Sequence, residues 1–242
     1  MITKPIKTRI FKEGENLITF ITEHIRSLKN ESIVIVTSKI VALSEGRTAA
    51  LIDDHSKERL IRSESEIALP TKYVWLTVKD GMVMASAGID ESNADGKLIL
   101  LPKDSYKSAK AIRKVLMRRY GLKKLGIVIT DSRTLPLRAG VMGLATGYAG
   151  FRGIRSYIGK KDIFGRKFKF SRTDVADSLA TSAVFVMGEG NEQIPLAVIE
   201  GAPVEFCDRV NKKELHIDLE DDIYLPFFSK LPKSKFKKSK RS

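Results

Sequence analysis

The sequence predicts a mixed α+β fold for this chain of 242 residues. Segments with apolar residues at helical spacing occur among short β-branched runs that are typical of strands. An Asp-Gly pair between two apolar runs adds the signal of a tight β-hairpin. Hydrophobic residues at 43% and charged residues at 30% describe a globular chain, and this length can bury a core without disulfides or metal ions.

The first predicted elements follow from periodicity. Residues 5–11 form a short basic start that we expect to be extended. Over residues 15–28 the apolar positions recur at helical spacing, which predicts an amphipathic helix. The β-branched run at 33–37 predicts a buried strand that ends in a polar loop at Ser38 and Lys39.

The next part of the chain predicts a helix followed by a hairpin. Residues 54–66 have a helical pattern. The apolar runs 73–78 and 82–86 flank Asp80 and Gly81, a pair that favours a tight turn. We therefore expect two antiparallel strands here.

A long helix and a strand occupy the middle of the chain. Ser105 is a candidate N-cap for a helix over 105–120, and Gly121 is its expected C-terminal stop. The apolar run at 126–130 then predicts a strand that ends at Asp131.

Glycine marks the third quarter of the sequence. Residues 140–165 contain seven of the 17 glycines, which predicts a backbone that bends closely around something. A helix is predicted over 174–187, with Thr173 or Ser171 as its cap, and a strand over 196–200.

The charge of the chain is concentrated at its end. The formal net charge is +14, and residues 230–242 hold seven Lys or Arg and no acid. We predict one domain over 1–222 and a basic, disordered tail over 223–242, because so little apolar surface cannot offset the entropy of ordering. The tail could act as a solubilising end, or it could contact RNA, the ribosome or a membrane surface without specificity.

Several classes of protein are excluded by what the sequence lacks. Cys207 is the only cysteine, which removes intrachain disulfides and cysteine-based zinc sites. There is no G-x-S-x-G elbow, no Walker-type phosphate loop and no G-x-G-x-x-G between a strand and a helix. No signal-like segment or long apolar run occurs, so we expect a cytoplasmic protein without a membrane span.

Three acids are candidates for chemistry, because each follows an apolar element beside glycine or a small hydroxyl residue. They are Asp90 in AGIDESN, Asp131 with Ser132 after GIVIT, and Glu189 in MGEGNE. Such oxygen donors suit Mg²⁺ or Mn²⁺, with phosphate oxygens and water completing the coordination. Each acid taken singly could equally be a helix cap or a turn residue.

Seven blocks of the sequence resemble the coenzyme F420-0:L-glutamate ligase family. In order they are VTSKIVALSEGR, AGIDESN, LLPKD, VITDS, GKKDIFGR, VADSLA and MGEG. They occur in the family's order and span about residues 6–203. The resemblance implies the α+β fold of this family, with two lobes and an interlocked homodimer.

The resemblance also implies an activity. Such a ligase uses GTP or ATP to activate a small-molecule carboxylate, in this family that of the deazaflavin precursor, as an acyl phosphate, and the amine of L-glutamate then displaces the phosphate. Two divalent cations, Mg²⁺ or Mn²⁺, would be held by Asp90, Asp131, Ser132 and Glu189, and the three acids would be catalytic. The positions matching nucleotide contacts are Ser38, Lys39, Asn93, Met187, Gly188, Gly190, Asn191, Glu192, Gln193 and Ile194.

The chain also departs from the family pattern. Leu43 stands where the family commonly has lysine, Leu135 stands where arginine is usual, and residues 7–10 read KTRI in place of a Gly-Leu-Pro-Leu-like segment. Lys7, Arg9 or Arg133 could replace the lost positive charges.

The departures keep other interpretations open. They include a ligase for a different carboxylate, a different nucleotide preference, and a non-catalytic or RNA-associated protein on the same scaffold. The sequence does not distinguish GTP from ATP, nor does it give the number of glutamates added.

Overall fold

The computed structural model describes residues 1–228, and residues 229–242 lie outside the described part. The elements in chain order are β1 (Ile2–Ile6), α1 (Leu17–His24), β2 (Ser32–Thr37), α2 (Ser38–Ser44), β3 (Thr48–Ala50), α3 (Asp54–Glu64), β4 (Ile67–Pro70), β5 (Trp75–Lys79), β6 (Met82–Ala85), the 3₁₀ turn η1 (Ser86–Gly88), β7 (Lys97–Ile99), α4 (Ser105–Tyr120), β8 (Leu125–Arg133), β9 (Met142–Ala149), β10 (Ile154–Ser156), β11 (Arg172–Asp174), α5 (Val175–Met187), β12 (Leu196–Glu200), the 3₁₀ turn η2 (Leu219–Asp221) and α6 (Leu225–Phe228). The mixed α+β class is confirmed.

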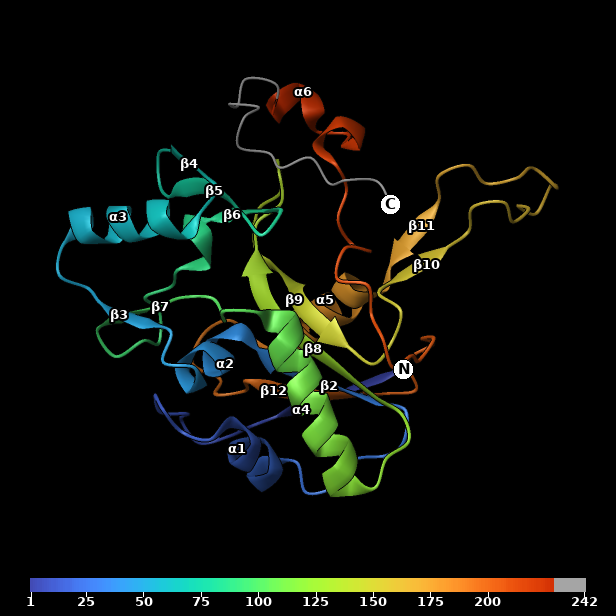
Figure 1. The fold of residues 1–242 in the computed structure, drawn as a ribbon, viewed down its shortest axis with the longest axis horizontal. Helices are drawn as coiled ribbons and strands as arrows, with labels where there is room; N and C mark the ends of the chain where they lie inside the picture. Colours follow the sequence, from blue (N-terminus) through green and yellow to red (C-terminus); the bar gives the residue numbers. More distant parts are fainter. Residues whose placement is uncertain (229–242) are drawn as a thin grey trace.

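A five-stranded sheet in the order β1-β12-β2-β8-β9 forms the centre of the molecule (Figure 1). Strands β2 and β8 are parallel, and every other neighbouring pair in this sheet is antiparallel. Strand β2 lies in the middle with both faces covered, so Ile33, Val34, Ile35 and Val36 are all fully buried. This is why its sequence is a continuous apolar run and not an alternating one.

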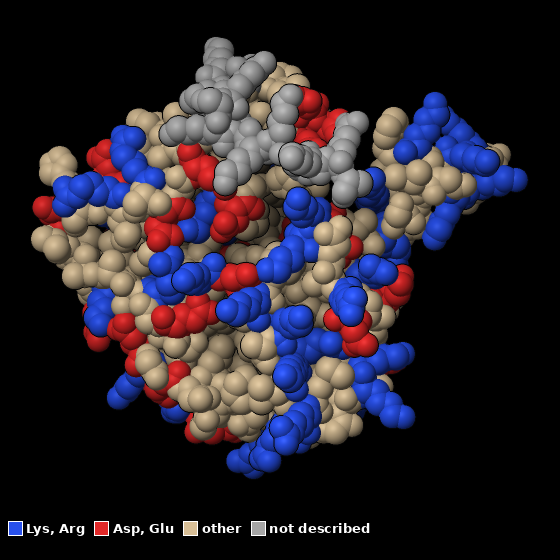
Figure 2. Space-filling view, viewed as in Figure 1, with Lys and Arg blue, Asp and Glu red and all other residues tan. Residues whose placement is uncertain are grey.

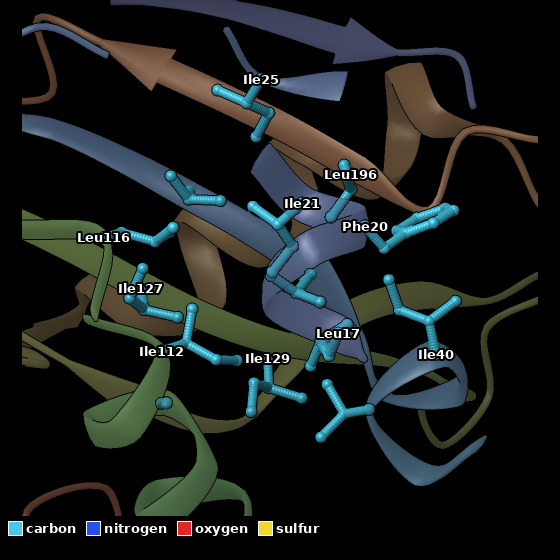
Figure 3. Close-up of a cluster of buried hydrophobic side chains, with 14 of the residues drawn as sticks. Leu17, Phe20, Ile21, Ile25, Ile40, Ile112, Leu116, Ile127, Ile129 and Leu196 are labelled. Carbon is cyan, nitrogen blue, oxygen red and sulfur yellow. The ribbon is translucent and has the colours of Figure 1, made fainter. Parts of the chain in front are cut away.

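The two faces of the sheet build two hydrophobic cores. On one face the side chains of α1, α2 and α4 pack with Val34, Val36, Ile127 and Ile129 (Figure 3). On the other face α5 packs with Ile33, Ile35 and Val128, together with Tyr148 and Phe151. Successive residues of β2 and β8 thus alternate between the cores, as the two-residue period of a strand requires.

A smaller group of elements lies beside the central sheet. The sheet β4-β5-β6 contains the predicted hairpin, which is confirmed, and α3 packs on it through the buried side chain of Ile61. The sheet β3-β7 leads from this group back toward α4. The loop at 90–96, which precedes β7, belongs to the candidate site.

The predicted end of α1 and the predicted cap of α4 are wrong. Helix α1 ends at His24, because Ile25 leaves the helical conformation, although Ile25 is buried and so contributes to the apolar pattern. The N-cap of α4 is Asp104 and not Ser105, since the Asp104 carboxylate accepts the Lys107 backbone N–H at 2.8 Å. The stop at Gly121 is confirmed, with a left-handed φ of 64°.

At α5, as at α4, the N-cap is an aspartate and not the predicted hydroxyl residue. Asp174, not Thr173 or Ser171, accepts the Asp177 N–H at 2.9 Å. The predicted loop after β2 is also wrong, because Ser38 and Lys39 begin helix α2 directly after the strand. The burial of Ile40, Val41 and Ala42 explains that helix, because its apolar side covers the sheet.

The glycine-rich region contains β9, which lies between two helices. A Cβ atom at Gly143 would lie 2.3 Å from the Val184 side chain of α5, and one at Gly147 would lie 2.5 Å from the backbone of Ser105 at the start of α4. These glycines therefore allow α4 and α5 to approach the strand closely, as the prediction of a closely bending backbone requires.

Strands β10 and β11 form a hairpin that projects from the body at the upper right of Figure 1. Of the predicted tail, residues 225–228 form α6, whereas 229–242 lie outside the described residues. Within residues 1–228 no helix is long and apolar enough to cross a membrane.

Candidate active site

Four segments bring the predicted residues to one region. They are the turn from β2 into α2, the end of β8, the loop at 90–96 and the loop that follows α5. Parallel pairing places Thr37 of β2 beside Thr130 of β8, so both strands deliver their next residues, Ser38 and Asp131, at the same edge. This edge is the carboxyl end of a parallel pair, where ligand sites commonly occur.

Asp131 is held on both carboxylate oxygens. The Ser38 hydroxyl donates to Oδ1 at 2.8 Å, and the Arg133 guanidinium forms an ion pair with Oδ2. Strand β8 extends through Arg133, two residues beyond its predicted end at Asp131, so Asp131 lies within the strand. Its pairing partner beyond Thr130 is β9 alone, since β2 stops there. Asp131 thus stands at the side that β2 leaves open.

Asp90 is paired with Lys39. The Lys39 ammonium lies 2.8 Å from Oδ2 of Asp90 and also donates to the Ser92 carbonyl at 2.7 Å. The Ser92 N–H donates to Oδ1 of Asp90 at 2.7 Å, which forms a turn within the loop. Burial alone would raise the pKa of Asp90, but the hydrogen bonds from Lys39 and Ser92 outweigh it and hold the pKa below its usual value. Asp90 is therefore a carboxylate anion.

Glu189 and the loop after α5 form the third wall. The Ser132 hydroxyl donates to Oε1 of Glu189 at 2.6 Å, and the Asn93 amide donates to the Gly190 carbonyl at 3.0 Å. Glu192 folds back over the loop and accepts the Gly190 N–H at 2.8 Å. The loop is thus fixed both to β8 and to the loop at 90–96.

These contacts close a circuit around one place. Asp131 is followed by Ser132, which donates a hydrogen bond to Glu189. The next residue, Gly190, accepts a hydrogen bond from Asn93 in the loop that also contains Asp90. Asp90 pairs with Lys39, and the neighbouring Ser38 donates to Asp131. Residues from four separate parts of the sequence are therefore linked by one closed chain of contacts. The side chains of Met187 and Ile194 pack into the core beneath it, so they can offer a ligand only backbone groups. Gly188, Asn191 and Gln193 are exposed on the same loop.

The residues fit a hard divalent cation in type. All the candidate ligands offer oxygen, from the carboxylates of Asp90, Asp131 and Glu189 and the hydroxyl of Ser132, the donor set that Mg²⁺ and Mn²⁺ prefer. Within residues 1–228, however, no three His, Cys, Asp or Glu side chains are grouped closely enough to hold a metal ion. In the structure each acid is instead bonded by a neighbouring lysine, arginine, serine or backbone group.

Two residues contribute here that the sequence motifs did not assign. Ser92 orients Asp90, and the spacing Asp-x-Ser is typical of such a side-chain turn. Arg133 was only one of three candidates for a replaced charge, yet it lies directly on Asp131. The two residues share a face because β8 continues through Arg133, which the predicted end of the strand at Asp131 did not indicate.

The KTRI segment lies beside the same loop. The Thr8 N–H donates to the Gln193 carbonyl at 2.9 Å. Leu43, in the place of a family lysine, packs partly into the core under α2, and Leu135 follows the end of β8 in an exposed segment. Neither position supplies a charge to the site.

Comparison with known proteins identifies the class. Residues 5–201 match the family described as F420-0:Gamma-glutamyl ligase. The Coenzyme F420:L-glutamate ligase of Methanococcus maripaludis is 35% identical over 81% of this chain and 86% of its own length. Proteins of the same name from Archaeoglobus fulgidus and Methanocaldococcus jannaschii are 30% and 32% identical, over 88% and 89% of this chain and 92% and 93% of their own lengths.

The fold, the oxygen-rich site and these relatives define an enzyme of the ligase class. More narrowly, the chain belongs to the F420-0:Gamma-glutamyl ligase family, which confirms the resemblance predicted from the seven sequence blocks.

Proposed function

We propose that this chain is a metal-dependent amide ligase that consumes GTP or ATP and joins L-glutamate to a small-molecule carboxylate. The relatives are named as ligases of L-glutamate to coenzyme F420, so a deazaflavin carboxylate is the first candidate for the acceptor. The observation that carries the proposal is the closed circuit of contacts that joins Ser38, Asp90, Asp131 and Glu189. Biosynthesis of coenzyme F420 is the corresponding role.

The proposed reaction has two steps. An oxygen of the acceptor carboxylate attacks the terminal phosphorus of the nucleotide, which releases the nucleoside diphosphate and forms an acyl phosphate. The amine of glutamate then attacks the acyl carbon, and inorganic phosphate leaves as the amide forms. Phosphoryl transfer of this kind depends mainly on positioning and on offsetting negative charge.

The chain's own residues suit these demands. Asp90, Asp131, Glu189 and Ser132 would hold one or two divalent cations, which would offset negative charge on the phosphates during transfer. Lys39 lies at the start of α2 with its ammonium on the Asp90 loop, where it can exchange the carboxylate for a phosphate oxygen. Asn93, through Gly190, holds the loop after α5 in place for the nucleotide.

The assembly is also part of the proposal. The resemblance implies an interlocked homodimer, and the projecting β10–β11 hairpin is an element that a second chain could cover. The non-catalytic alternative is less well supported, since the three acids are retained together within one contact circuit.

Nucleotide binding by the purified chain tests the proposal. We expect GTP or ATP to bind with Mn²⁺ in calorimetry, and Glu189→Gln to weaken this binding at least tenfold, about 1.4 kcal/mol, because a ligand charge is lost. Glu220→Gln is the matched control, since Glu220 is exposed on η2, which is not one of the four segments that form the circuit. No binding by the unmutated chain at millimolar nucleotide, or equal effects of the two variants, would contradict the proposal.

An activity measurement then identifies the acceptor. The chain is mixed with the nucleotide, Mn²⁺, L-glutamate and a deazaflavin carboxylate, and phosphate release is followed with and without each substrate. We expect release that requires both the carboxylate and glutamate. Release with other carboxylates only would assign a different substrate to the same ligase chemistry.

A further inference from the structure

Arg133 is an unusual residue for the end of a strand. Its side chain is only 4% exposed, and Nη1 pairs with Asp131, whereas Nη2 is buried without a hydrogen-bond partner among the described residues. A buried, unpaired donor costs about 1–3 kcal/mol, and more when the group is charged. Folding alone does not favour this arrangement, so the free Nη2 indicates an oxygen that binds there.

The position of Arg133 places that oxygen in the candidate site. Nη1 and Nη2 belong to one planar guanidinium, so Nη2 lies next to Nη1, the nitrogen that pairs with Asp131. Arg133 is the last residue of β8, and every residue from 134 to 142 is exposed. The guanidinium therefore occupies the last buried position of the strand, beside the open edge left by β2.

The other candidates for a replacement charge are occupied or distant from the acids. The Arg9 guanidinium pairs with Glu15 and Glu23 and lies over the ring of Phe20. Lys7 is exposed, with no contact to Asp90, Asp131 or Glu189 among its hydrogen bonds and ion pairs. Arg133 is thus the candidate that contacts an acid of the circuit, in a chain that has leucine at both 43 and 135.

We propose that Arg133 recognises the triphosphate: Nη1 fixes the orientation of Asp131, and Nη2 donates to an oxygen of the phosphoryl group that is transferred. This inference rests on the proposed function, because it assigns a residue to the nucleotide bound there. A planar guanidinium can hold a carboxylate and a phosphate oxygen at the same time, which an ammonium cannot do with the same geometry. Arg133 then supplies a positive charge that Leu43 and Leu135 do not.

The test compares triphosphate with diphosphate binding. The full chain, with Mn²⁺, is titrated with GTP and GDP, or with ATP and ADP if these bind more tightly. We expect Arg133→Gln to weaken triphosphate binding at least tenfold and diphosphate binding less than threefold, because the lost donor faces only the terminal phosphoryl group. Arg118→Gln is the control, since Arg118 is exposed in the last turn of α4.

A second variant covers the case in which the glutamine variant does not fold. Arg133→Lys keeps the charge but loses the second donor. We expect the ratio of triphosphate to diphosphate affinity to fall by at least threefold in this variant. Its melting temperature should stay close to that of the unmutated chain.

The outcomes separate this inference from the proposed function. Equal weakening of triphosphate and diphosphate binding, or no change in either, would overturn the role of Arg133 while leaving the ligase proposal in place. An unmutated chain that binds neither nucleotide would overturn the proposed function and this inference together.

Discussion

At the scale of single residues, Gly147 shows why the composition of β9 is constrained. The strand lies between α4 and α5, and at Gly147 the space for a side chain is filled by the backbone at the start of α4. Backbone atoms cannot rotate away as a flexible side chain can, so an added methyl group must displace the helix. Because Asp104 caps this same helix end, the displacement would also weaken that cap.

We predict that Gly147→Ala lowers the free energy of unfolding by about 2–3 kcal/mol or more, through overpacking. Urea denaturation followed by circular dichroism measures the change. Gly46→Ala is the comparison, because Gly46 has a φ of 64° but nothing within 4 Å of an added Cβ. Backbone strain alone should cost that variant about 1 kcal/mol. Equal losses in the two variants would argue against steric crowding at Gly147.

The acids of the site also differ as individual residues. Asp90 and Asp131 each have a cationic partner, whereas Glu189 is bonded by the hydroxyl of Ser132. The proposed divalent cation would therefore meet no resident cation at Glu189, but it would compete with Lys39 at Asp90. Lys39 can leave more readily than Arg133, since its side chain is 27% exposed and that of Arg133 is 4% exposed.

At the scale of elements, local patterns predicted most of the fold. The β-branched run of β2, the hairpin β5–β6, α4 with Gly121 and the helix α5 all follow from spacing and turn chemistry. The predictions that were wrong depended on tertiary contacts. The end of α1 was placed too late because Ile25 is apolar, yet Ile25 packs in the core outside the helix. The extension of β8 to Arg133 needed β9 as a partner, which no local pattern specifies.

The sequence motifs nominate the residues of the candidate site, but they do not specify the contacts among them. Sequence blocks brought Asp90, Asp131 and Glu189 together as a set, because they were recognisable motifs. Which side chain neutralises which acid depends on how the 90–96 loop and α2 meet, and this is a three-dimensional relation. The pairing of Arg133 with Asp131 likewise depends on the extension of β8 to Arg133, because residues two positions apart share a face only within a strand.

The start of α5 contains a half-buried pair of acids. Asp174 caps the helix, and Asp177 accepts the Ala145 N–H of β9 at 2.8 Å. Burial, followed by the charge of Asp174, raises the pKa of Asp177 to about 7, although Arg133 acts in the opposite direction. The folded chain therefore keeps a proton on this pair that the unfolded chain, with an Asp pKa of about 3.9, releases.

We predict that this pair makes the chain less stable as the pH rises from about 4 to about 7, because a raised folded-state pKa favours folding only below it. Asp177→Asn should flatten this dependence and raise the free energy of unfolding at pH 8 by at least about 1 kcal/mol, since one unit of pKa corresponds to about 1.4 kcal/mol. Thermal unfolding at several pH values measures it. Asp54→Asn, in the exposed first turn of α3, is the control. An unchanged slope in Asp177→Asn would contradict the assignment.

At the scale of the whole molecule, the positive charge is unevenly distributed. Figure 2 shows Lys and Arg side chains along α4 at the front and gathered on the projecting β10–β11 hairpin, while acidic side chains occur near α6. Helix α4 carries Lys107, Lys110, Arg113, Lys114, Arg118 and Arg119. In the candidate site, by contrast, Asp90 and Asp131 are paired with Lys39 and Arg133, whereas Glu189 accepts only the hydroxyl of Ser132 among the described contacts. If the site binds an anionic nucleotide as proposed, we expect a divalent cation to add positive charge there.

The last seven cations of the sequence lie in residues 230–242, outside the described residues, and beyond the part of the chain that matches the ligase family, which ends at 201. We predict that deleting 230–242 leaves the affinity for GTP with Mn²⁺ unchanged and abolishes binding to single-stranded RNA. Neutralising about seven phosphates should give a slope of log affinity against log salt of about −5, because the slope is about −0.7 per contact for single strands. Filter binding of RNA to the full and shortened chains measures the loss of RNA binding and the salt slope. The salt concentration is varied between 50 and 200 mM, a range over which such contacts weaken steeply. A shortened chain that bound GTP at least tenfold more weakly, about 1.4 kcal/mol, would instead show that these lysines help to neutralise the bound triphosphate.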